Sequence, residues 1–274
     1  ALPTLEKQRF EAIQARLSEL SNQYENNVLD ASQDFNLHIT DANRLTGLPD
    51  HALHTARQLA EEKGLTGWVF NLEIPCYLAV VTYADDRSLR EEIYKAYVTR
   101  ASDQGPSAGK FDNSSVMDEM LALRHEKANL LGFANYAELS LATKMADSTN
   151  QVIQFLSDLS HRGYQQAVLE FDRLQTFAKK EYGISEMAAW DMAYMSEKKM
   201  QARYAISQEE LRPFFPLPKV MKGLFTIINK LYGMTMEEVK GVETWHPDVT
   251  CYCVKDSENK VRGYIYADLF ARQN

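Results

Sequence analysis

This 274-residue sequence is poor in cysteine and has no long apolar run. Its three cysteines, Cys76, Cys251 and Cys253, are an odd number without the spacing of a disulfide framework. They fit a reducing compartment, and we expect a cytoplasmic protein. No apolar run approaches the roughly 18–20 residues that span a bilayer, and no positively charged segment followed by an apolar one opens the chain. We therefore expect no membrane partner.

Basic residues are also scarce. There are 30 Lys and Arg against 38 Asp and Glu, which gives a formal net charge of −8. Proteins that bind nucleic acid need an excess of cations to neutralise phosphates, so we expect no nucleic-acid partner. With 45% hydrophobic and 25% charged residues, the chain has the composition of an ordinary globular protein that can bury a core.

Complete nucleotide-binding and metal-binding motifs are absent. Gly105 and Gly109 belong to neither G-x-G-x-x-G nor a P-loop. His51 and His54 lie one helical turn apart, but the nearest glutamates on that helix lie two turns further along. The pair Cys251-x-Cys253 has no second Cys or His pair to complete a site. We expect no metal ligands in this chain and no cofactor bound by it alone.

What the sequence does contain is helical spacing. Apolar residues three and four positions apart predict one amphipathic helix over 4–29, and similar patterns recur through most of the chain. Asp50 is a candidate N-cap, and the boxes Ser88-x-x-Glu91, Ser148-x-x-Gln151 and Ser207-x-x-Glu210 are further candidate helix starts. The fold class we predict is mainly α, with helices at 50–63, after Ser88, from Asn113 or Ser114 to Gly132, from Ser148 to Gly183 and at 218–232.

Short segments of alternating polarity predict a few strands. Residues 35–39 and 66–73 are expected to pair in a small sheet. Residues 249–272 are expected to form a C-terminal hairpin, with the polar stretch 255–260 as its turn. We treat 1–274 as one region, with a sub-boundary suggested by the Gly- and Ser-rich loop 102–114.

The last strand carries the best candidate for a binding surface. Tyr264 and Tyr266 share one face of it, and Asp268 continues that face. A strand with a hydrogen-bonding face suits the lining of a cleft where a substrate binds, and a solvated sheet face explains the pattern equally well. The preceding Trp245-His246-Pro247-Asp248 can provide a general base with its orienting carboxylate, or form an ordinary turn.

Several long stretches of the sequence resemble a known family. They are residues 17–31, 89–114, 124–148, 188–198, 211–217, 245–249 and 263–274. In this order they resemble the thimet-oligopeptidase (M3) family of zinc metallopeptidases. The resemblance implies a mostly α-helical, zincin-like protein with two lobes and a deep channel that admits short peptides. It also implies a zinc ion held by H-E-x-x-H and by a glutamate on a following helix.

The chain itself contains no H-E-x-x-H. The nearest match is His125-Glu126-Lys127-Ala128-Asn129, where asparagine replaces the second histidine. An asparagine cannot replace an imidazole on zinc, so we expect no catalytic residue here. We expect this chain to be a segment that lies upstream of the metal site, forms part of the channel wall and is inactive alone. The alternative is a non-catalytic helical protein that binds peptides or other proteins.

The resemblance also has a consequence for the C-terminal hairpin. In the family the strand 263–272 leads into further chain that extends its sheet. Here we expect an unpaired strand edge and an uncovered apolar face that bears Ile265, Leu269 and Phe270. Such edges and patches recruit partners, so self-association through this region, or poor order of the hairpin, is expected.

Overall fold

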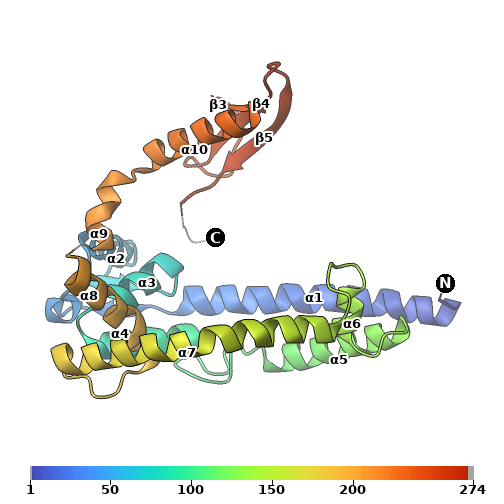
Figure 1. Cartoon of the computed structure of the whole chain (residues 1–274), viewed down its shortest axis with the longest axis horizontal. Coiled ribbons are helices and arrows are strands. Elements are labelled where there is room, and N and C mark those ends of the chain that lie inside the picture. Colours follow the sequence, from blue (N-terminus) through green and yellow to red (C-terminus); the bar gives the residue numbers. More distant parts are fainter. Residues whose placement is uncertain (1, 206, 271–274) are drawn as a thin grey trace. The chain divides into compact units, whose positions relative to one another are not determined.

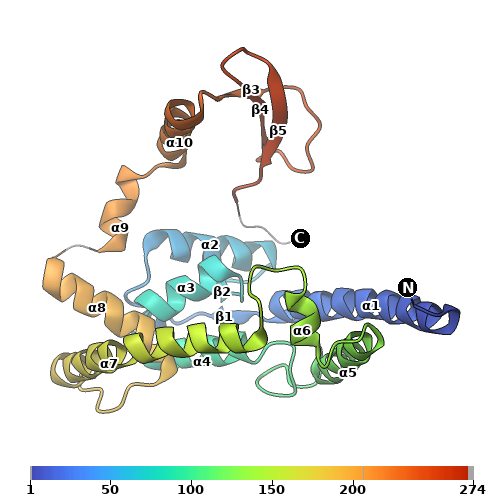
Figure 2. The ribbon, with the colours of Figure 1, turned by 45° about the vertical axis from the view of Figure 1, so that its right-hand side comes forward.

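The computed structural model describes residues 2–205 and 207–270. It is mainly α-helical, as the sequence predicts (Figure 1), with two small antiparallel sheets, β1–β2 and β3–β5 (Figure 2). Its internal contacts divide the chain into two compact units, Ala1–Lys199 and Met200–Asn274. The loop 102–114 lies inside the first unit, and the sub-boundary suggested there stays a prediction.

The first unit is built from helices around one two-stranded sheet. Its elements in chain order are α1 (Thr4–Asp34), β1 (Leu37–Ile39), the 3-10 helix η1 (Ala42–Leu45), α2 (Asp50–Glu62), β2 (Trp68–Phe70), α3 (Ile74–Tyr83), α4 (Arg87–Val98), α5 (Ser114–Leu130), α6 (Tyr136–Leu141), α7 (Thr149–Tyr182), the 3-10 helix η2 (Ala189–Asp191) and α8 (Met192–Tyr204). The last residues of α8 belong to the second unit.

The first helix, α1, pairs lengthwise with α5 (Figure 1). Its stripe buries Ile13 and Leu20 completely, and bidentate pairs of Arg9 with Glu126 and of Arg16 with Glu119 link the two helices at the surface. The helix predicted over 4–29 is therefore confirmed, and it continues to Asp34.

The core of the first unit lies where β1, β2 and the helices α2, α3 and α4 meet (Figure 2). The two strands pair as predicted, and the pairing is antiparallel, with Leu37 opposite Phe70. Side chains that are fully or almost fully buried in this core include Phe70, Val80, Leu89 and Ile93. A smaller cluster joins the end of α7 to α8 through Leu174, Ala178, Tyr194 and Met195.

Two helix starts differ from the sequence predictions. Asp50 is the first residue of α2, and Pro49 occupies the N-cap. The N-cap of α4 is Asp86, whose carboxylate accepts from the backbone N–H groups of Ser88 and Leu89. Asp86 can replace Ser88 because a carboxylate accepts both bonds and complements the positive helix end.

The second unit packs one helix against a three-stranded sheet. It contains α9 (Gln208–Leu211), the 3-10 helix η3 (Arg212–Phe214), α10 (Leu217–Tyr232), β3 (Thr235–Val239), β4 (Thr250–Lys255) and β5 (Val261–Ala267). The sheet order is β3-β4-β5, entirely antiparallel.

The predicted hairpin is confirmed as β4 and β5, but the sequence reasoning missed the third strand. Strand β3 follows Gly233, which ends α10 with φ +66° in the left-handed region that favours glycine. Residues 271 and 272 of the predicted hairpin lie outside the described residues. A third strand matters because an isolated two-stranded hairpin is only marginally stable.

Candidate functional site

The three-stranded sheet has two chemically different faces. Antiparallel pairing places Cys251 opposite Tyr266 and Cys253 opposite Tyr264. Directly opposed residues point to the same side of a sheet, so this register shows which side chains share one face. We call it the tyrosine face, and it carries Glu237, Val239, Cys251, Cys253, Tyr264 and Tyr266.

The structure places the predicted site residues as their alternation indicates. The side chains of Tyr264 and Tyr266 are 60% and 43% exposed on the tyrosine face. Asp268 follows the end of β5 and is exposed. The pKa of Tyr266 lies above its ordinary value. The main cause is that the Tyr266 hydroxyl loses contact with water, and the neighbouring Cys251 adds to the effect. The role of these three residues in binding a substrate stays a prediction.

A further aromatic residue joins this surface. The indole Nε1 of Trp245 donates a hydrogen bond of 2.8 Å to Oδ2 of Asp268. The Trp245 ring also packs on that of Tyr266, with 5.7 Å between the ring centroids. The sequence allowed two interpretations of the segment Trp245–Asp248, a general base with its orienting carboxylate or an ordinary turn. In the structure the tryptophan of this segment lies against the tyrosine face.

The histidine of that segment is engaged in turn geometry. Nδ1 of His246 accepts the backbone N–H of Asp248 at 3.2 Å and lies 3.6 Å from its carboxylate. The carbonyl oxygen of His246 accepts the N–H of Val249 at 3.1 Å. This arrangement is that of a hydrogen-bonded turn around Pro247.

The opposite face of the sheet packs against α10 and leaves a groove. Tyr252 of β4 meets Phe225 of α10 edge to face at 5.0 Å. Beside this contact lies an open cavity of about 760 Å³, lined by apolar side chains such as Met221 and by the carboxylates Glu238 and Asp248. The expected apolar residues Ile265, Leu269 and Phe270 are 45%, 51% and 55% exposed.

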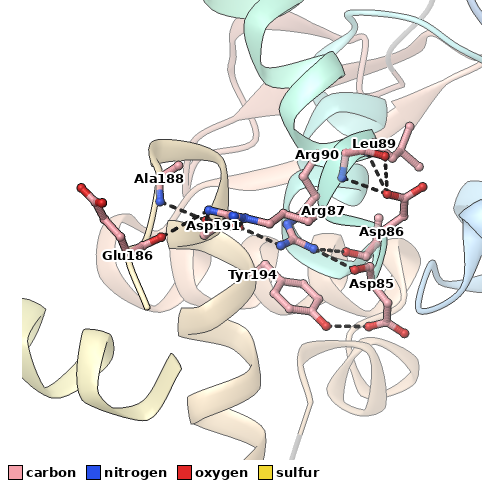
Figure 3. Close-up of polar contacts among 11 residues, drawn as sticks. Asp85, Asp86, Arg87, Leu89, Arg90, Glu186, Ala188, Asp191 and Tyr194 are labelled. Carbon is pink, nitrogen blue, oxygen red and sulfur yellow. Dashed lines mark hydrogen bonds and ion pairs between the residues drawn. The ribbon is translucent and has the colours of Figure 1, made fainter. Parts of the chain in front are cut away.

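In the first unit the densest polar cluster joins α4 to η2 and α8 (Figure 3). Asp191 is fully buried and accepts hydrogen bonds from Arg87 at 2.7 Å and from Arg90 at 2.8 Å. The Arg90 guanidinium also donates to the carbonyl oxygen of Ala84 at 2.7 Å and lies 4.0 Å over the ring of Tyr194.

A second carboxylate completes this cluster. Asp85 accepts the hydroxyl of Tyr194 at 2.7 Å and lies 3.1 Å from the ammonium of Lys198 (Figure 3). Burial acts to raise the pKa of Asp191, but the hydrogen bonds from Arg87 and Arg90 outweigh it and lower that pKa. A carboxylate held ionised between two guanidinium groups fastens these elements together and has no role as a proton donor near neutral pH.

The described residues do not fit a catalytic metal. Within residues 2–205 and 207–270, no group of three or more His, Cys, Asp or Glu could hold a metal ion. His54 lies exposed on α2, and Cys251 and Cys253 are buried in the sheet. No helix in the described part of the chain is long and apolar enough to cross a membrane.

Comparisons with known proteins point to one family. The family model described as Peptidase family M3 matches residues 80–274. Oligopeptidase A of Escherichia coli (strain K12) is 53% identical over 273 residues, which cover 100% of this chain and 40% of the relative. Oligopeptidase A of Haemophilus influenzae is 51% identical over 98% of this chain and 39% of its own length.

A plant protein shows the same pattern of coverage. The probable cytosolic oligopeptidase A of Arabidopsis thaliana is 40% identical over 99% of this chain and 39% of its own length. The chain thus spans about two fifths of the length of these curated relatives.

Proposed function

The chain belongs to peptidase family M3, and from this we propose that it forms part of a zinc metallopeptidase that hydrolyses short peptides in a deep channel. The observation that carries the proposal is the match to proteins named oligopeptidase A, at 53% and 51% identity over nearly the whole chain. The expected resemblance to this family is confirmed. The cytoplasm as the place of action belongs to the same proposal, since one relative is named a probable cytosolic oligopeptidase A.

Within such an enzyme this chain would form part of the channel wall and of the surface that faces the substrate. Zinc would be held by residues outside the described ones, because these contain no suitable ligand group. The tyrosine face is the surface we assign to peptides. Tyr264 and Tyr266 offer hydroxyls and exposed rings there, and both lie on β5, a strand at the edge of its sheet.

The physical support for this assignment is the chemistry of that face. A peptide presents backbone amides and apolar side chains in alternation, and an aromatic ring with a hydroxyl can contact both. Tyrosine is enriched at binding surfaces because it offers a large rigid contact area for two side-chain torsions. Asp268, anchored by Trp245, adds a carboxylate at the same end of the strand.

Two arms of one experiment test the proposal. In the first arm the purified 274-residue chain is incubated with a short peptide, with and without added zinc. In the second arm the longest natural gene product that contains this sequence is incubated with the same peptide. We expect the chain to leave the peptide intact and to bind no stoichiometric zinc, and the longer product to cleave it until a chelator is added. A longer product that binds the peptide without cleaving it would favour the non-catalytic alternative.

A further inference from the structure

Trp245 is held by contacts of its side chain with Asp268 and Tyr266. Its Nε1 donates to Oδ2 of Asp268 at 2.8 Å, which uses the only hydrogen-bond donor of the indole. Its ring lies against Tyr266, 5.7 Å between centroids and tilted by 33°. The ring orientation is therefore set by two independent contacts on the tyrosine face.

The backbone around Trp245 is equally constrained. The hydroxyl of Thr244 donates to the carbonyl oxygen of His246 at 3.0 Å, and the same oxygen accepts the N–H of Val249 at 3.1 Å. Pro247 fixes its own φ within this turn. Val249 is buried, so the turn is anchored in the unit at its C-terminal end. Little conformational freedom remains for Trp245 to lose when something binds to it.

Despite these contacts Trp245 remains exposed. The residue is 65% exposed, beside Tyr266 at 43% and Tyr264 at 60%. Trp245, Tyr264 and Tyr266 thus form an exposed aromatic cluster next to the Asp268 carboxylate. Tryptophan and tyrosine are enriched among the residues that dominate binding energies, because they offer a large rigid contact area.

We propose that Trp245 is a specificity-determining residue of the tyrosine face, where its exposed ring receives a large apolar or aromatic side chain of the bound peptide. This inference rests on the function proposed above for that face. The side chain of the peptide packs on the ring surface of Trp245 and on Tyr266, and this ring surface supplies the selectivity. Peptides with a small or charged side chain at that position lose this contact.

The test measures the ratio of the affinities of two short peptides that differ only in one central residue, Phe or Ala. Each peptide is titrated into the full 274-residue chain, and binding is followed by the NMR chemical shifts of the backbone amides. An aromatic contact favours the Phe peptide by roughly tenfold. Trp245→Ala is expected to reduce this ratio to below about twofold, whereas Trp245→Phe keeps an aromatic ring at this position and most of the ratio.

Two further variants separate this inference from the proposed function. Tyr232→Ala removes an aromatic side chain that is 70% exposed on α10 and absent from the tyrosine face, and it is expected to leave the ratio unchanged. Tyr264→Ala is expected to weaken both peptides. If both peptides bind and Tyr264→Ala weakens them, but Trp245→Ala keeps the ratio, the inference is wrong and the proposed function stands.

The remaining outcomes are equally decisive. A loss of the ratio in Trp245→Phe as large as in Trp245→Ala would show that the Asp268 hydrogen bond, and not the ring surface, selects the peptide, and would overturn the inference. If neither peptide binds the wild-type chain, the peptide role of the tyrosine face fails, and the inference fails with it.

Discussion

The guanidinium of Arg90 and the carboxylate of Asp191 meet 2.8 Å apart in the interior of the first unit, with exposures of 1% and 0%. They are separated by 101 residues in the sequence. This pair, with Arg87 as the outer partner, fastens η2 and the start of α8 to α4 (Figure 3). Breaking a buried pair on one side leaves an uncompensated charge, which is far more costly than losing a surface pair.

The first prediction follows from that asymmetry. Asp191→Asn keeps the shape of the side chain but leaves the Arg90 guanidinium buried beside a neutral group. We expect the free energy of unfolding of the first unit to fall by about 3–5 kcal/mol. Denaturant titration with a far-ultraviolet signal measures it. The matched control is Glu119→Gln, which breaks the exposed pair with Arg16 and should hardly move the midpoint. Equal effects of the two variants would contradict the account.

The same pair predicts a pH dependence. The pKa of Asp191 lies below its ordinary value in the folded state, so below about pH 4 the unfolded chain binds more protons at this residue. Its contribution to stability is therefore complete above about pH 4 and is lost as the pH falls through the folded pKa. We expect the stability difference between wild type and Asp191→Asn to shrink over this acid range. A difference that stays constant from about pH 6 to about pH 3 would contradict an ionised Asp191 in the folded state.

Two glycines provide a prediction about backbone contact. Gly47 and Gly64 both have positive φ, +88° and +68°. A Cβ on Gly47 would clash with the backbone carbonyl oxygen of Tyr83 and lie 2.9 Å from the Asp85 carboxylate, whereas one on Gly64 would meet nothing within 4 Å.

Gly64→Ala is therefore expected to cost only the left-handed backbone strain, roughly 1–2 kcal/mol. Gly47→Ala should cost at least twice as much, because the Asp85 carboxylate is already held by Tyr194 and Lys198 and cannot move freely. Thermal unfolding of the two variants compares them directly. Similar losses would show that the close approach around Gly47 is not maintained in solution.

The apolar residues of β5 predict self-association. Ile265 is 45% exposed on an edge strand, with Leu269 and Phe270 close by. We expect the isolated chain to form concentration-dependent dimers in sedimentation velocity, and Ile265→Lys to weaken them. Glu258→Lys in the turn between β4 and β5 adds a lysine away from this patch and serves as the control. A chain that stays monomeric up to high concentration would refute this expectation.

Local signals allowed much of the fold to be predicted. The periodicity of apolar residues gave the long helices, and the glycines that follow α7 and α10 mark both helix ends. Strand β3 was missed because its sequence, TMEEV, places two adjacent glutamates where alternation is expected. This segment becomes a strand because it pairs with β4, and its own sequence does not reveal that partner.

The polar interactions were harder to predict for the same physical reason. Tyr264 and Tyr266 could be placed on one face because they occupy alternate positions of one strand, and Asp268, just after that strand, continues the alternation. The partner of Asp268 could not, since Trp245 lies 23 positions away and reaches it only after the sheet has formed. The Arg90–Asp191 pair likewise carries no local pattern, because ion pairs between distant segments depend on tertiary packing.

We propose that the tyrosine face of the second unit binds short peptides. An amide chemical-shift map of the 274-residue chain during titration with a short peptide tests this binding most directly. We expect the largest shifts on residues 264–268 and on the Trp245 indole, and unchanged shifts in the core around Ile93. Saturable shifts confined to other elements, such as α7, or the absence of any shift at β5, would contradict it.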